Sequence, residues 1–201
     1  MSDDIQIDLS ATQASSERIR DLLVAARRDL NLSLYEYTSK IRIAPSEIPH
    51  SHPVLTLNNR LDKKNDLICT YIHEQMHWYV TWFSHAHTKA WHSVINDIKS
   101  RYPDIPIKFP EGANTHFSSL LHVLVNWLEI EAASAVLGRE VAVEVASKNW
   151  VYGGIYKIVL RDWDELSTLF HEVGVAPIRM ATDMTPEDFA LAARMEEAPI
   201  N

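Results

Sequence analysis

The stretch "TYIHEQMHWYV", residues 70–80, decides the fold and indicates where chemistry is expected. It contains His73, Glu74 and His77 in the spacing His-Glu-x-x-His, with apolar residues on both sides. Apolar residues also recur beside the histidines at helical spacing: Ile68, Ile72, Met76 and Val80. This periodicity predicts a buried helix over residues 64–83 that carries one polar stripe.

Residues four apart on a helix lie one turn above each other, so His73 and His77 present their imidazoles to a common point. This arrangement suits two ligands of one tetrahedral zinc ion. Glu74 follows the first ligand and is placed to take a proton from zinc-bound water. The motif therefore predicts a Zn2+ site with Glu74 as general base. The alternative is a hydrogen-bonded pair of core histidines without a metal.

A catalytic zinc site usually takes three protein ligands, so a third side chain is needed. His87 begins the stretch "HTKAWHSVINDI" after a loop, where the chain can turn back toward the metal. We expect His87 to be the third ligand. His85 in the loop and His92 within the following helix are its competitors.

A second source of ligands is the long apolar segment of the second half, residues 118–138. On a helix, His122, Asn126 and Glu129 fall at i, i+4 and i+7 and form a polar stripe. Glu129, or Glu131 beside it, is the alternative third ligand, with His122 as an alternative ligand or a support. Without a metal, the same stripe is a buried hydrogen-bonded network.

The reaction also needs a donor that stabilises the oxyanion, and Tyr152, Tyr156 and His122 are candidates. Each is otherwise an ordinary packing or hydrogen-bonding residue. Cys69 lies four residues before His73 and is expected to be a small core residue. As the single cysteine, it rules out an internal disulfide and a four-cysteine zinc ribbon.

Length and composition indicate one globular domain: 201 residues, 46% hydrophobic and 23% charged. The net charge of −8 argues against a broad nucleic-acid surface or an anionic-membrane surface. No signal sequence or membrane-spanning run stands out, so we expect a cytoplasmic protein. Residues 1–14 are expected to be flexible. Residues 15–201 are expected to form the domain, with a metal-site half (15–105) and a helical half (115–201).

Apolar periodicity, capping residues and turn residues predict an α+β fold that is mainly helical, with a small sheet before the motif helix. The expected strands are residues 35–44 and 53–59. The expected helices are residues 16–31, capped by Ser15 or Ser16, then 64–83, 88–102, 118–138 ended by Gly138, 151–160, 162–174, and 185–197 opened by Thr185 with Pro186 at its first position.

A helix comes first in the chain, then a short strand pair that ends in "HPVLTLN", then "YIHEQMH" and then "HTKAWHSVI". In this order of its segments the chain resembles the SprT-like and related small zincin metallopeptidases. Their HExxH motif is followed by His-x-x-x-Phe or Trp, positions that His87 and Trp91 occupy here. The resemblance covers residues 17–105 and implies a zincin-like domain with zinc on His73, His77 and His87. It also implies that Glu74 is the general base and that the strand "VLTLN" is the edge along which a peptide lies.

The chain departs from that family pattern in two places. Thr88 stands where the second motif usually has glycine, and the cysteine-rich ribbon of many SprT members is missing from the sequence. In addition, "WLEIEAASA" resembles the Glu-x-x-Ala-Asp element of zincins with a glutamate ligand, which keeps Glu129 as an alternative.

The motif and the resemblance together predict a zinc-dependent metallopeptidase that acts on a peptide or protein substrate. One alternative is a non-enzymatic zinc-binding or protein-interaction domain. A fourth protein ligand such as Cys69 or His92 would favour it, because structural zinc sites are closed. The other alternative is a zinc hydrolase that acts on a non-peptide amide.

Overall fold

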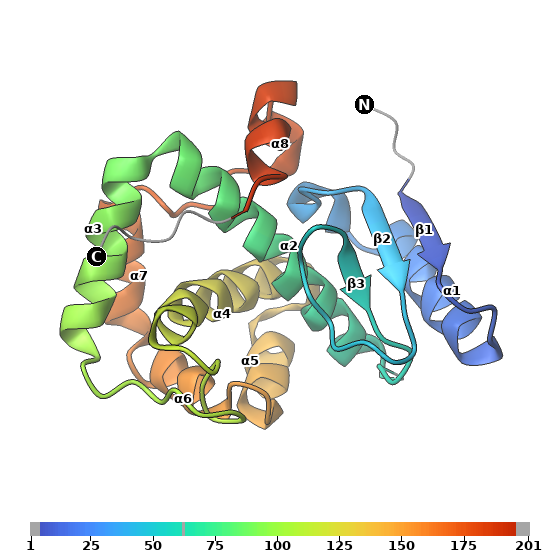
Figure 1. Cartoon of the computed structure of the whole chain (residues 1–201), viewed down its shortest axis with the longest axis horizontal. Helices are drawn as coiled ribbons and strands as arrows, with labels where there is room; N and C mark the ends of the chain where they lie inside the picture. Colours follow the sequence, from blue (N-terminus) through green and yellow to red (C-terminus); the bar gives the residue numbers. More distant parts are fainter. Residues whose placement is uncertain (1–4, 62, 196–201) are drawn as a thin grey trace. The chain divides into compact units, whose positions relative to one another are not determined.

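A computed structural model of the chain describes residues 5–61 and 63–195 (Figure 1). These residues form a mainly helical α+β protein with a small parallel sheet. The chain divides into two compact units. Among the described residues, unit 1 comprises 5–61, 63–82 and 180–195, and unit 2 comprises 83–179. The expected flexibility of residues 1–4 and the expected helical end at 196–197 lie outside the described residues.

The sheet of unit 1 contains β1 (Gln6–Leu9), β2 (Lys40–Ile43) and β3 (Leu55–Leu57), in the order β1-β2-β3. Both pairs are parallel, and Ile41 pairs with Ile7 on one side and with Leu55 on the other. Parallel neighbours need a crossover connection. Between β1 and β2 the crossover contains α1 (Ala14–Asp29), which Figure 1 shows beside the strands. The core of this region comprises Ile19, Leu23, Ala26, Ile41, Ile43, Leu55 and Leu57.

The sequence prediction of two strands in one small sheet is confirmed, but their limits are narrower. The expected strand 35–44 begins only at Lys40, because a 3-10 helix, η1 (Leu32–Tyr35), and an irregular segment precede it. The predicted serine cap of α1 is wrong. Gln13 is the residue at that cap, and it makes no side-chain capping bond. β1 is only four residues long and was not predicted from the sequence.

The segment before β2 is held by Gln75 of α2 (Lys64–Ala86). The Gln75 side-chain oxygen accepts hydrogen bonds from the backbone N–H of Tyr37 at 2.8 Å and of Thr38 at 3.0 Å. Its amide group donates to the carbonyl of Thr38 and to the hydroxyl of Tyr71, each at 3.0 Å. Because a buried side chain satisfies these backbone groups, the segment needs no strand partner there.

The same network extends to α1. Tyr71 donates to Glu36 at 2.9 Å, and Arg27 forms a bidentate pair with Glu36 at 2.6 and 2.8 Å. Burial raises the pKa of the Tyr71 phenol well above its usual value, and the nearby Glu36 carboxylate adds to this effect. Tyr71 therefore remains a protonated donor, and the network fixes α2 against α1 and residues 36–38.

The buried motif helix that the sequence predicts is confirmed, since every residue from 71 to 84 is buried. Two of its tryptophans hold neighbouring segments of unit 1. The Trp78 indole donates to the Ser51 carbonyl at 2.9 Å, and its ring stacks on His52 at 4.3 Å between centroids. The Trp82 indole donates to Asp188 at 2.7 Å, within α8 (Pro186–Ala192).

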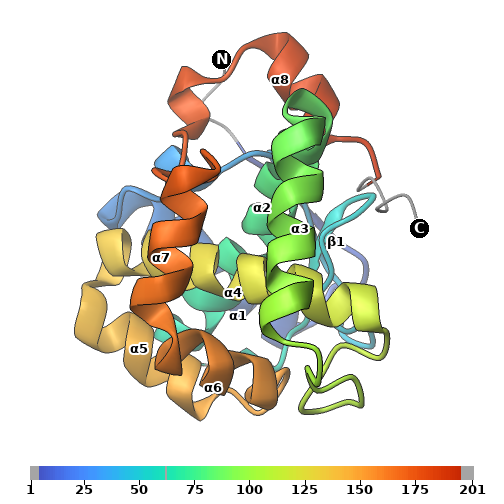
Figure 2. The ribbon, with the colours of Figure 1, turned by 90° about the vertical axis from the view of Figure 1, so that its left-hand side faces the viewer.

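Unit 2 is helical, with α3 (Thr88–Arg101), α4 (His116–Leu137), α5 (Arg139–Lys148), α6 (Gly153–Arg161) and α7 (Trp163–Glu172). Figure 2 shows α4 running across α3 and α7. Trp127 of α4 is buried, and it stacks on Trp163 at 5.2 Å and meets Phe170 edge to face at 5.1 Å. Its indole donates to Ser167 at 3.1 Å, so α7 is fixed to α4 by both packing and a hydrogen bond.

The expected helices of the second half are confirmed, with small shifts of their ends except in α8, which ends at Ala192 and so falls short of the expected 197. Gly138 ends α4 with a φ of 90°, a conformation that glycine adopts without strain. Thr185 caps α8 in a capping box, with Pro186 at the first position. The segment 151–160 is helical from Gly153 onward. α5 was not predicted from the sequence, and it follows Gly138 without an intervening loop.

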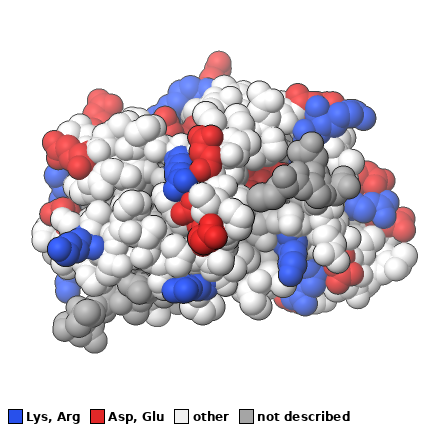
Figure 3. All heavy atoms as spheres, turned by 90° about the horizontal axis from the view of Figure 1, so that it is seen from above, with Lys and Arg blue, Asp and Glu red and all other residues white. Residues whose placement is uncertain are grey.

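In the part of the chain that the structure describes, α4 is long and apolar enough to cross a membrane by length and composition alone. Its most apolar window has a mean hydropathy of 1.4, and 72% of that window is buried inside the protein. Such burial is typical of a core helix. On the face seen in Figure 3, basic and acidic side chains are interspersed among uncharged ones.

We predict that Gln75→Leu destabilises the protein, because it leaves backbone groups of Tyr37 and Thr38 buried without partners. Each such group costs about 1–3 kcal/mol, so the free energy of unfolding should fall by roughly 3 kcal/mol or more. Urea unfolding followed by tryptophan fluorescence measures this change. Gln6→Leu on the exposed face of β1 is the control, with an expected change within about 0.5 kcal/mol. Equal effects of the two substitutions would contradict the anchoring role of Gln75.

Candidate metal centre

The two motif histidines lie on one face of α2, as their spacing predicts. His73 and His77 are each 8% exposed, and their ring centroids are 5.1 Å apart with an interplanar angle of 70°. Both therefore present ring nitrogens to the same region, one turn apart. Both side chains are buried, and burial strengthens any electrostatic interaction with a bound cation.

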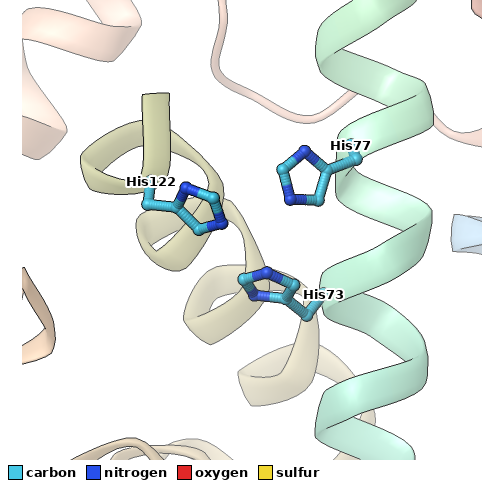
Figure 4. Close-up of side chains that lie close together, drawn as sticks. All are labelled: His73, His77 and His122. Atoms are coloured by element: carbon cyan, nitrogen blue, oxygen red, sulfur yellow. The ribbon is translucent and has the colours of Figure 1, made fainter. Parts of the chain in front are cut away.

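A third histidine joins the pair in the structure. His122 of α4 is 5% exposed, and the ligand atoms of His73, His77 and His122 all lie within 4.8 Å of one another. Figure 4 shows the three imidazole rings converging from α2 and α4. This group could hold a metal ion.

The hydrogen bond of His122 defines which of its nitrogens can bind a metal. Its Nδ1 lies 2.7 Å from the carbonyl oxygen of Ser118, and a carbonyl can only accept, so Nδ1 carries the proton. Nε2 of the neutral ring then keeps a lone pair for a metal. A histidine oriented in this way by a backbone carbonyl is typical of metal ligands in proteins. The ring of Tyr152 packs against His122, with 4.1 Å between centroids.

Glu74, the predicted general base, is 5% exposed and follows His73 directly on α2. Consecutive helical residues differ by about 100° around the axis, so Glu74 does not point along the line of the two histidines. It is not a member of the three-histidine group. Its place beside that group, and not in it, is consistent with proton transfer and not ligation.

The structure brings His122, and not the preferred candidate His87, to the pair on α2. His87 is the exposed N-cap residue of α3, and its ring contacts Phe83 at 5.1 Å between centroids. His85 and His92 are half-buried and, like the buried Cys69, do not belong to the group found among the described residues. The sequence signal for His122 was the polar stripe on residues 118–138, from which His122 was predicted only as an alternative ligand or a support.

The rest of that polar stripe lies inside unit 2. Glu129 is 2% exposed and accepts a short hydrogen bond from the hydroxyl of Tyr156, which is also 2% exposed. Glu129, the alternative third ligand, and Tyr156, a candidate oxyanion donor, are therefore hydrogen-bonded to each other. Asn126 is fully buried, and its Oδ1 and Nδ2 have no hydrogen-bond partner among the described residues.

Comparison with known proteins adds no family, since no protein-family model, curated protein or solved structure matches the chain. The resemblance to SprT-like zincins therefore stays a prediction that rests on the motifs quoted above.

We predict that His122→Ala removes metal binding as completely as His73→Ala does, because each substitution takes one of three ligands. His87→Ala should leave the metal content unchanged. The measurement is elemental analysis of each protein after reconstitution with Zn2+ and removal of excess metal. Loss of the metal from the His87 variant, with retention in the His122 variant, would assign the site to His87 instead.

Proposed function

We propose that the chain is a zinc-dependent metallopeptidase with a zincin-like domain, in which His73, His77 and His122 hold Zn2+ and Glu74 is the general base. The observation that supports it most directly is the convergence of three buried histidines beside the glutamate of an HExxH motif. Three neutral histidines with one open position are a common ligand set of catalytic zinc. The proposed substrate is a peptide or protein.

The geometry fits this metal. Zn–N distances of about 2.0–2.1 Å in a tetrahedral site place ligand nitrogens about 3.4 Å apart. The ligand atoms here lie within 4.8 Å of one another, so modest side-chain rotations would bring them to that spacing. His122 already has its Nδ1 proton engaged by Ser118, which leaves Nε2 for the metal.

A bound zinc ion supplies a lowered pKa of coordinated water and polarises the carbonyl that is attacked. In the proposed reaction, Glu74 takes a proton from the attacking water and passes it to the leaving amine. The buried surroundings of Glu74 exclude bulk water from this transfer. Tyr152, whose ring packs on His122, is the proposed hydrogen-bond donor to the developing oxyanion.

The competing proposal is a structural zinc site in a non-enzymatic interaction domain. Structural zinc usually has four protein ligands. The group identified within residues 5–61 and 63–195 contains three, and neither Cys69 nor His92 is among them. This count favours an open position for water and substrate. A zinc hydrolase of a non-peptide amide would use the same residues, and cleavage assays separate it from a peptidase.

We predict that Glu74→Gln abolishes most peptide hydrolysis while leaving the metal in place. The substitution keeps size and polarity but removes the base, so the rate should fall by at least about two orders of magnitude. The measurement is cleavage of a diverse peptide library by zinc-loaded protein, together with zinc content and thermal stability. Glu172→Gln, an exposed position on α7, is the matched control with unchanged activity.

Three results would count against the proposal. Loss of zinc from the Glu74 variant would assign Glu74 a ligand or structural role. Chelator-resistant cleavage would remove the metal from the reaction. A zinc-loaded wild-type protein that cleaves no peptide would favour the non-enzymatic domain, or the hydrolase of non-peptide amides if simple amides are cleaved.

A further inference from the structure

Unit 2 contains a cavity of about 480 Å³ that is separate from the three histidines. Its apolar lining comes from Pro110, Ala146, Trp150, Gly153 and Leu160, and Tyr156 also lines it. This volume is within the range of small-ligand pockets in proteins. The cavity is large enough for one aromatic side chain with part of its backbone.

An exposed aromatic pair stands at this cavity. Trp150 is 66% exposed and Phe109 is 47% exposed, and the two rings meet edge to face at 5.4 Å between centroids. Ile107 on the same loop is 39% exposed. An exposed ring that lines a cavity and contacts a second exposed ring indicates a binding surface. A third aromatic ring can pack against Trp150 in the offset or edge-to-face geometry that aromatic rings prefer.

The two charged side chains that line the cavity indicate a ligand without net charge. Glu111 and Lys157 line the cavity and lie 3.4 Å apart, with side chains 54% and 77% exposed. The Glu111 carboxylate can accept a hydrogen bond and the Lys157 ammonium can donate one. Together they suit a neutral group that has both an N–H and a carbonyl. A peptide backbone has this character, whereas a phosphate or a polyamine does not.

The residues that form the cavity also contact the polar stripe of α4. Tyr152 lies between the cavity residues Trp150 and Gly153 in sequence, and its ring packs on His122. Its φ of 57° is left-handed, which is rare for a bulky residue and common at functional sites. Tyr156 lines the cavity and donates to Glu129. One short segment, residues 150–156, therefore connects the cavity to His122.

We propose that this cavity is a substrate subsite that holds an aromatic side chain of a peptide, with Trp150 as its specificity-determining residue. Its assignment to a substrate rests on the proposed function, whereas binding of the aromatic group does not. The exposed ring of Trp150 packs on the ligand's ring, and Glu111 and Lys157 hydrogen-bond the ligand's backbone.

The binding test uses 15N-labelled, zinc-loaded protein and two probes, N-acetyl-L-phenylalaninamide and N-acetyl-L-alaninamide. We expect the phenylalanine probe at millimolar concentration to shift the NMR signals of the Trp150 indole and the Gly153 amide, with the alanine probe inactive. Ser147 also lines the cavity. Trp150→Ala and the cavity-filling Ser147→Trp should abolish the shift of the Gly153 amide. Ile48→Ala, an exposed apolar position in unit 1, should leave both shifts unchanged. No shifts in the wild type, equal shifts with both probes, or an unchanged Gly153 shift in Trp150→Ala would overturn the subsite.

The kinetic test separates this subsite from the proposed function. For peptides that contain phenylalanine, Trp150→Ala should raise KM about tenfold with kcat unchanged, because the contact contributes to binding alone. For peptides that contain only small side chains, the variant should match the wild type. If both the wild type and Trp150→Ala cleave phenylalanine-containing peptides with the same KM, the subsite is overturned and the proposed peptidase activity is not. Binding of the phenylalanine probe without cleavage of any peptide would overturn the substrate role and the peptidase together, leaving an aromatic-ligand site.

Discussion

The carboxamide of Gln75 has four hydrogen bonds, three with the backbone of residues 37–38 and one with Tyr71, and the orientation of α2 depends on them. Because each helical residue turns by about 100°, His73 and His77 lie about 160° around the axis from Gln75. The face of α2 that is fixed to its own unit is thus nearly opposite the face that carries the histidines. A rotation of the helix would break several buried hydrogen bonds, so both ring positions are strongly constrained.

The sequence predicts the elements whose apolar spacing is long and regular. The helix with Ile68, Ile72, Met76 and Val80 is the clearest case, because burial on nearly all sides leaves a pattern that few other structures share. Short elements carry little periodic information. This explains why β1 and α5 were missed, the first being four residues long and the second following Gly138 directly. The false start of the strand at residue 35 has another cause, since a side chain 37 or 38 positions away satisfies that backbone.

Within the candidate site, too, the sequence predicts the residues that local geometry positions and not the one that tertiary contacts position. His73, Glu74 and His77 are positioned by local helical geometry, so the sequence places them correctly relative to one another. The third histidine depends on tertiary contacts that spacing along the chain does not encode. His87 is close to His77 in sequence, whereas His122 is 45 residues beyond His77 and is indicated in the sequence only by a polar stripe. A buried polar stripe on an apolar helix therefore indicated the third member of the histidine group better than proximity along the chain did.

Asn126 of α4 has a structural cost that a stability measurement can detect. Its carboxamide is fully buried without a hydrogen-bond partner among the described residues, which is unfavourable for the folded state. Leucine has a similar size and would avoid that cost, as buried apolar replacements often do. A random library of this gene screened only for survival after heating should therefore enrich apolar residues at position 126. A library screened for metal binding by the histidine group would show whether asparagine is retained at position 126 despite its cost to stability.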